Sequence, residues 1–469
     1  MSPLLLAVLV VLIGVGAVVL LVVRLNKVMR RTPAAASTHL AKPLTREYVR
    51  SVNAKIQAQG IDFRKNHPQR LNRRYIVVGG SGLVGSQIIL DLLDGGTPPW
   101  AMRLVDIRPP SRDEFTGSGR ASRVPFVQAD ITSGPSTTRA FGGAWPTCVA
   151  SLPLTVFHTA AVIRPYERQA VFYTRCSQVN VVGTAHSISA AREAGADVFI
   201  YTSSSHVAAS GVDWFARPWQ GGEPRNFAQR LDDRDFFQPL KTASGFPSNY
   251  ARSKAEAERL VCGADAGPGF RTGCVRPGNG VYGHRDDNII GRMLRRGRVP
   301  TFSAPWVQSW VSVRNVSLAH LLLEAALLAG GASGRPFTVT DEGAPLRFED
   351  LYLLLDELSV TGVRVDYPPP AALLLAAFAV ERYCVLLERV PWLRGLGLRE
   401  PSDPVCLFQP GIVDSAVTQI ADDGDARRAV GEGGLGYRGV CETVEGICVM
   451  VGEWNAFVES STHLTKLSE

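Results

Sequence analysis

A glycine-rich stretch near residue 80 restricts the fold of this chain more than any other feature. The segment VVGGSGLVGSQII follows a short apolar run and precedes a helical pattern, and its glycines fit two overlapping spacings, GxxGxxG and GxGxxG. Glycine permits a tight turn and lets backbone N–H groups approach a pyrophosphate at a helix N-terminus. The order strand, glycine loop, helix therefore predicts a dinucleotide-binding βαβ unit; the alternative is a glycine turn that serves only helix–strand packing. The residues expected at the cofactor are Gly79, Gly80, Ser81, Gly82, Leu83, Val84 and Gly85.

The pattern of the first unit continues along the chain. Short apolar runs (YIVVG, MRLVD, TVFHTAA, VFIYTSS, TGCVRP) alternate with segments of helical spacing (LVGSQIILDLLDGG, NVVGTAHSISAAREAG, YARSKAEAERLV). Strands that alternate with helices of this length predict an α/β fold with a doubly wound parallel sheet. We expect an NAD(P)-binding Rossmann domain at 73–275, a smaller substrate-binding region at 276–400 and a C-terminal tail at 401–469.

Acidic residues follow two of the predicted strands. Asp106 closes the second strand about 20 residues beyond Gly85, where a carboxylate can accept hydrogen bonds from the adenosine ribose and repel a 2′-phosphate. This position favours NAD as the cofactor, although Arg108 could instead accommodate the phosphate of NADP. Asp130 ends a third strand, where it is either an adenine contact or an ordinary strand-end carboxylate.

Tyr250 and Lys254 lie four residues apart in NYARSK and would share one face of a helix. A free phenol ionises near about pH 10, and an ammonium group close to it favours the phenolate and lowers its pKa. Such a pair suits proton transfer to or from a hydroxyl or carbonyl group. Ser203, Ser204 and Ser205 end an earlier strand at the sheet edge where such folds bind ligands, so one of their hydroxyls can complete the set. The alternative is two ordinary helix residues and serines that only satisfy a strand end.

The N-terminal residues 3–23 form an uncharged, almost wholly apolar run that is long enough to cross the hydrocarbon core of a bilayer. A cleaved signal peptide would instead have a basic leading region and a shorter apolar run. Lys and Arg follow the run and none precedes it, which predicts a single-pass membrane anchor with the rest of the chain in the cytosol. We expect 1–31 to be the transmembrane anchor with its basic flank, and 32–72 to be a connector.

A second apolar segment lies at 369–394. Its uncharged stretch at 371–380 is too short to span a bilayer. It is either a buried or interface helix, or an amphipathic helix that lies in the membrane surface.

Composition argues against other classes of function. The net charge is +7, but the basic residues are concentrated at 24–31 and 64–74, without the basic–aromatic platform or zinc spacing of a nucleic-acid-binding protein. The eight cysteines are scattered and lack the paired spacing of a metal site or a disulfide framework, as expected of reduced thiols in the cytosol. We expect neither a nucleic-acid partner nor a metal.

The motifs GGSGLVG, VDIR, FHTAA, VNVVGT, IYTSSS, YARSK and RPGNGVYG come in the order of the extended short-chain dehydrogenases/reductases. More narrowly, the chain resembles the 3β-hydroxysteroid dehydrogenase/isomerase family, including its sterol-4α-carboxylate 3-dehydrogenase (decarboxylating) branch. FHTAA, IYTSS and the late VRNVSLAHLLLEAAL carry this narrower resemblance, which covers roughly residues 75–360.

The resemblance implies roles for individual residues. Tyr250 is implied to be the general acid/base, Lys254 to lower its pKa and hold the nicotinamide ribose, and Ser204 to hydrogen-bond the substrate oxygen. Asn180 is implied to support the active-site helix, and Pro277 to lie beside the nicotinamide. Ile131 and Ala160 are expected as further cofactor contacts, beside Asp106, Arg108 and Asp130.

The resemblance also implies an activity and a compartment. The chain would be an oxidoreductase of the endoplasmic reticulum membrane that transfers a hydride between NAD(P) and the 3β-hydroxyl or 3-keto group of a sterol or steroid. Coupled decarboxylation, Δ5 isomerisation and a homodimer are left open. One alternative is a nucleotide-sugar epimerase or reductase on the same scaffold, which would want a polar, arginine-bearing pocket and no anchor. Another is a non-catalytic NAD(P)-binding sensor, which could lack the Tyr/Lys pair.

Overall fold

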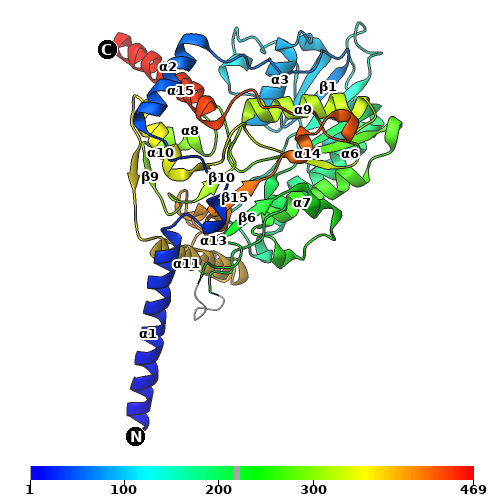
Figure 1. The fold of residues 1–469 in the computed structure, drawn as a ribbon. Helices are drawn as coiled ribbons and strands as arrows, with labels where there is room; N and C mark the ends of the chain where they lie inside the picture. The colour runs from blue at the N-terminus through cyan, green and yellow to red at the C-terminus, as the bar shows by residue number, and fades with distance from the viewer. Residues whose placement is uncertain (1, 216–221, 469) are drawn as a thin grey trace.

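A seven-stranded sheet is the centre of the larger region of the protein (Figure 1). The computed structural model describes residues 2–215 and 222–468. The strand order is β12-β7-β5-β4-β1-β2-β3, and every neighbouring pair is parallel. The order reverses between β1 and β4, so the sheet is doubly wound, as the sequence predicts. Its strands are β1 (Arg74–Val78), β2 (Met102–Asp106), β3 (Phe126–Gln128), β4 (Leu154–His158), β5 (Ala196–Thr202), β7 (Arg271–Pro277) and β12 (Pro336–Val339).

Helices cover both faces of this sheet. Tyr75 and Val77 of β1 belong to the apolar cluster that includes α3 (Leu83–Asp94) and α9 (Val313–Leu328). Ile76 and Val78 belong to the opposite cluster, which includes residues of α4 (Gly134–Gly142), α6 (Thr184–Glu193) and α7 (Asn249–Gly263). Burial on both faces explains why the strands are continuous apolar runs rather than alternating patterns.

A smaller region with its own core adjoins the sheet. It contains a four-stranded sheet in the order β13-β10-β15-β6. One apolar cluster joins this region, with Trp306, Leu351, Leu374 and Ile447 among its buried members. Its elements are β6 (Ala228–Leu231), β10 (Val307–Gln308), β13 (Leu346–Arg347), β15 (Thr418–Ala421), α2 (Arg46–Gln59), α8 (Ile290–Arg296), α10 (Phe348–Leu358), α11 (Pro370–Arg389), α13 (Pro410–Ala416) and α15 (Thr443–Ser468). Shorter elements are α5 (Thr174–Ser177), α12 (Trp392–Gly395), α14 (Gly424–Arg427) and the strand pairs β8 (Val281–Tyr282) with β11 (Val311–Ser312) and β9 (Arg298–Pro300) with β14 (Arg364–Asp366).

The two regions exchange segments across the domain boundaries that the sequence predicts. Strand β12, from the expected substrate-binding region at 276–400, extends the Rossmann sheet, whereas β6, from within 73–275, pairs with β15. Residues 401–469, expected as a tail, supply β15, α13 and α15 to the smaller region, and the expected connector at 32–72 supplies α2. The strands of the smaller sheet have two to four residues, too few to show a clear period in the sequence.

Helix α1 (Pro3–Met29) projects from the body of the molecule, next to α11 (Figure 1). The described residues include two helices long and apolar enough to cross a membrane, and the apolar window near the N-terminus has none of its residues buried. The second, α11, has 44% of its window buried. The end of α1 belongs to the body: Leu25 and Met29 are buried, and Trp306 Nε1 donates to the Met29 carbonyl at 3.0 Å.

Candidate active site

The glycine loop connects β1 to α3 at the carboxyl edge of the sheet. Gly79 has a φ of +78°, and a Cβ there would lie 2.5 Å from the backbone nitrogen of Ala160, which follows β4. A Cβ on Gly85 would lie 2.4 Å from the Gly79 carbonyl oxygen. A side chain at Gly79 would therefore clash with the loop after β4, and one at Gly85 would push α3 away from the glycine loop. Gly82 is the N-cap of α3 and has no side chain to accept hydrogen bonds from the first turn of the helix. The backbone N–H groups of that turn therefore suit a pyrophosphate.

Asp106, the last residue of β2, lies beside this loop. Its carboxylate accepts hydrogen bonds from the backbone N–H groups of Ser81 at 3.1 Å and Arg108 at 3.2 Å. Arg108 is exposed, so its side chain can turn toward a ligand at the same edge. This placement fits the ribose contact expected of Asp106.

Asp130 lies in the loop after β3 and not at the strand end, because β3 ends at Gln128. One of its oxygens accepts hydrogen bonds from the Thr132 backbone N–H at 2.9 Å and the Thr132 hydroxyl at 2.7 Å. Ile131 is buried, and its side chain lies against Gly183. The Asp130 carboxylate therefore has a local role in the turn, and its adenine contact stays a prediction.

Tyr250 is the second residue of α7, which begins here because the Ser248 side chain caps the helix by accepting from the Ala251 N–H at 3.2 Å. Tyr250 is 8% exposed. Burial raises the pKa of its phenol to about 12, and the neighbouring Ser204 hydroxyl acts to lower that pKa. The structure thus brings together the strand-end serine and the helix tyrosine, as the sequence predicts.

Lys254 lies one turn farther along α7 and is 2% exposed. Its Nζ donates to the Thr202 carbonyl at 2.6 Å and lies 4.4 Å from the centre of the Tyr201 ring. Burial lowers the pKa of Lys254 to about 7. The group that acts to lower the Tyr250 pKa is the Ser204 hydroxyl, so the effect expected of Lys254 on the phenol stays a prediction.

Asn180 connects α7 to the loop after β4. It is fully buried in a π-helical turn over Gln178–Gly183, accepts from the Val162 N–H at 2.8 Å and donates to the Ser253 hydroxyl at 2.9 Å. Ser253 in turn donates to the Tyr250 carbonyl at 2.9 Å. This contact chain is consistent with the support role that the family resemblance implies for Asn180. Pro277 ends β7, next to β5, at the same edge of the sheet.

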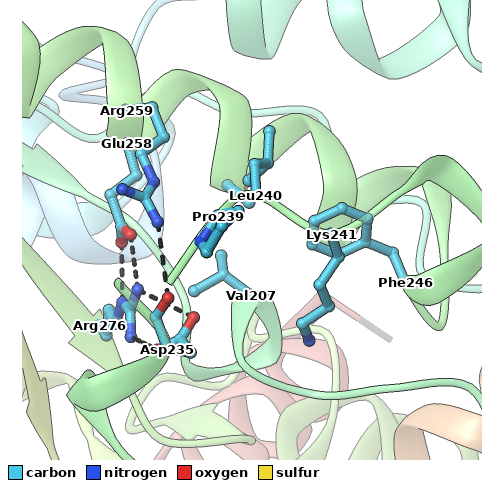
Figure 2. Close-up of a pocket in the computed structure, with 10 residues that line it drawn as sticks. Val207, Asp235, Pro239, Leu240, Lys241, Phe246, Glu258, Arg259 and Arg276 are labelled. Atoms are coloured by element: carbon cyan, nitrogen blue, oxygen red, sulfur yellow. Dashed lines mark hydrogen bonds and ion pairs between the residues drawn. The ribbon is translucent and has the colours of Figure 1, made fainter. Parts of the chain in front are cut away.

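A buried ion-pair network behind the site was not foreseen from the sequence (Figure 2). Arg276, the residue before Pro277, contacts Glu258 of α7 at 2.6 Å and Asp235 at 2.6 Å. The Ser203 hydroxyl donates to Glu258 Oε2 at 2.6 Å. Ser203 is therefore engaged in this network, which leaves Ser204 as the serine that faces Tyr250. The arginine in TGCVRP, a charge inside an apolar strand, was the available signal.

The family model of the 3-beta hydroxysteroid dehydrogenase/isomerase family matches residues 76–364. The chain belongs to this family. It is 28% identical over 287 residues to the 3-beta-hydroxysteroid dehydrogenase of Mycolicibacterium neoaurum, covering 58% of this chain and 66% of that protein. It is 24% identical over 412 residues to a 3beta-hydroxysteroid-dehydrogenase/decarboxylase of Arabidopsis thaliana (84% and 63%), and 26% identical over 307 residues to the human sterol-4-alpha-carboxylate 3-dehydrogenase, decarboxylating (64% and 69%). The match thus spans slightly less than two thirds of the length of the first two relatives.

Solved structures show the same fold. The UDP-glucose 4-epimerase of Thermotoga maritima superposes with a TM-score of 0.53 at 18% identity, covering 82% of this chain and 99% of the epimerase. A UDP-glucose-4-epimerase of Stenotrophomonas maltophila, solved with bound NAD, gives 0.54 at 17% identity, covering 83% and 99%. At such identities these structures establish the extended short-chain dehydrogenase/reductase architecture alone.

Proposed function

We propose that this protein is a membrane-anchored, NAD(P)-dependent oxidoreductase that acts on the 3β-hydroxyl or 3-keto group of a sterol or steroid. The observation that carries the proposal is the placement of Tyr250 and Lys254 on α7 at the carboxyl end of β5, where Lys254 Nζ lies 2.6 Å from the Thr202 carbonyl, next to a loop whose glycines suit a dinucleotide. Family membership and the names of the relatives support the substrate class.

In the oxidative direction, Ser204 hydrogen-bonds the substrate hydroxyl while the Tyr250 phenolate accepts its proton. A phenol with a pKa of about 12 is a poor base at neutral pH, so the assembled site must lower it. Lys254 is placed to do so if its ammonium leaves the Thr202 carbonyl to hold the cofactor ribose, because a nearby positive charge favours the phenolate. Bound NAD supplies the hydride acceptor.

Two coupled reactions remain compatible with this site. A substrate with a 4-carboxylate would give a β-keto acid that loses carbon dioxide, and a substrate with a Δ5 double bond would give a ketone whose acidic C4 permits isomerisation. The names of the relatives include both chemistries.

The competing substrate class is a nucleotide sugar, as in the epimerases of the same fold. A pocket that binds a sugar diphosphate requires arginines that are free to contact the phosphates. The arginines of the loop after β4 and of α5 are instead bound by carboxylates: Arg164 by Glu167, Arg168 by Glu381 and Arg175 by Glu400. This pairing favours a lipophilic alcohol.

Stereochemistry at the carbinol carbon tests the proposal. Cofactor reduction, followed by absorbance in detergent or liposomes, is expected with 3β-hydroxysterols and much more weakly with their 3α epimers, whose carbinol hydrogen points away from the nicotinamide. Equal rates with both epimers would contradict the assigned geometry.

The cofactor choice rests on Asp106. NAD is expected to be the better cofactor by kcat/KM, because the carboxylate repels the 2′-phosphate of NADP. Asp106→Ala should reduce the difference in kcat/KM between NAD and NADP, because the repulsion is gone and Arg108 remains to accommodate the 2′-phosphate. Steady-state kinetics with both cofactors would measure this difference. A wild-type preference for NADP would refute this role of Asp106.

The surface around α11 supports a membrane location. Leu386, Trp392 and Leu396 are exposed, Trp392 by 67% and Leu396 by 70%, and the exposed Arg389 lies among them. Helix α11 lies where α1 leaves the body (Figure 1). Apolar and basic side chains together suit the headgroup region of an anionic membrane. We infer that α11 lies on the cytosolic face of the endoplasmic reticulum membrane and that the sterol enters from that side.

A further inference from the structure

We propose that Arg168 and Glu381 are a positioning pair that sets the location of Tyr250 and couples it to the membrane-facing helix α11. The inference rests on the proposed role of Tyr250 as the acid/base of the reaction. It is carried by a continuous path of contacts from α11 to the first turn of α7.

The path starts with a bidentate ion pair. Arg168 Nε lies 2.7 Å from Glu381 Oε1, and Arg168 Nη2 lies 3.1 Å from Glu381 Oε2. The Glu381 side chain is 1% exposed, and the Arg168 guanidinium also lies 4.9 Å from the centre of the Phe378 ring, one turn away on the same helix. A two-point contact of this kind fixes the orientation of the arginine as well as its distance. Arg168 is thereby held to one place on α11.

The path continues through the residues on either side of Arg168. The backbone carbonyl of Glu167 accepts from the Asn249 N–H at 2.8 Å, and that of Gln169 accepts from Asn249 Nδ2 at 2.8 Å. Asn249 is the first residue of α7 and directly precedes Tyr250. A shift of Arg168 therefore moves both acceptors that hold Asn249, and the phenol moves with it.

A second set of ion pairs joins the same loop to α11. The buried Glu167 carboxylate contacts Arg175 at 2.9 Å, and Arg175 reaches Glu388 of α11 at 3.1 Å. Arg175 also contacts Glu400 at 2.6 Å. Two connections from one helix to one loop make α11 and the start of α7 move as a unit. Since α11 also packs against α1, the seating of the protein on the bilayer bears on the position of Tyr250.

The test uses the full-length protein in nanodiscs. Glu381→Gln keeps the size of the side chain and removes its charge, so the arginine loses its fixed partner. We expect kcat for a 3β-hydroxysterol to fall on the order of 10- to 100-fold, as small misplacements of a catalytic group can. The KM for NAD should stay within about two-fold, because the glycine loop is untouched. Arg168→Lys, which keeps the charge but loses the fork, should give an intermediate kcat.

Asp197→Asn is the matched control, because it removes a carboxylate from the buried Arg73 at the amino end of the sheet. It should leave kcat unchanged and cost less thermal stability, because the Asp197 side chain is 31% exposed and that of Glu381 only 1%. Hydrogen exchange supplies a readout that needs no turnover: in Glu381→Gln, peptides that cover 164–175 and 246–254 should exchange faster, and peptides that cover 75–95 should not. Unchanged exchange at 246–254, or a kcat loss no larger than in the control, would overturn the proposal. Absence of sterol turnover in the wild type would refute the function, while the exchange result would still decide on the pair.

Discussion

Replacing Tyr250 with phenylalanine is expected to abolish turnover while leaving the affinity for the cofactor within a few-fold. The ring still fills its buried place at the start of α7, but the titrating oxygen beside the Ser204 hydroxyl is gone. Acid–base groups contribute about 10²–10⁴ to a rate, so the variant should fall at least that far. Absorbance of the reduced cofactor measures the rate, and a titration with NAD measures the binding.

Tyr173→Phe is the matched control for this change. The Tyr173 phenol bonds Glu256, on a different face of α7, and has no contact with Ser204 among those that the structure shows. Its removal should leave the rate close to that of the wild type. A Tyr250→Phe protein that keeps more than about a tenth of the wild-type rate would refute the acid/base assignment.

Truncations of α1 should separate anchoring from folding. A protein that lacks residues 1–20 is expected to lose integral membrane association and keep its fold, because the side chains of residues 2–20 are exposed. A protein that lacks residues 1–30 also loses the buried Leu25 and Met29 and the Trp306–Met29 hydrogen bond. Removing buried side chains of this size costs about 2–5 kcal/mol each, so this second protein should unfold at a clearly lower temperature. Alkaline extraction and thermal unfolding measure the two effects.

The residual association of the 1–20 truncation identifies what else contacts the bilayer. Release by high salt would implicate the basic residues at 24–31, since exposed charges are screened at high ionic strength. Resistance to both salt and alkali would mean a second membrane element, with α11 the first suspect. Equal stability of the two truncations would contradict the structural role of Leu25 and Met29.

The parts of the site that the sequence predicts are those with short-range signals. The glycine loop is predictable because two positions close together in the sequence, Gly79 and Gly85, have no room for a side chain. Tyr250 and Lys254 share a helix face by spacing alone, and the parallel strands are apolar runs because helices bury both faces of the sheet.

The parts that the sequence does not predict depend on residues far apart in the chain. Arg168 and Glu381 are separated by 213 positions, and no local pattern marks either as a partner. The smaller sheet pairs β6 with β15, and each of these strands has only four residues. The end of α1 belongs to an apolar core, although the sequence before it predicts only a membrane anchor. Ser203, Ser204 and Ser205 are adjacent and chemically equal in the sequence, and only the placement of Glu258 and Tyr250 tells them apart.

The most direct test of the account is a comparison of substrate classes with one preparation of the full-length protein. Purified protein in nanodiscs, supplied with NAD, is incubated with a 3β-hydroxysterol, a sterol 4-carboxylate and a UDP-sugar in parallel, and formation of the reduced cofactor is followed by absorbance. The account predicts turnover of one or both sterols and none of the UDP-sugar. Efficient turnover of the UDP-sugar, with none of either sterol, would contradict it.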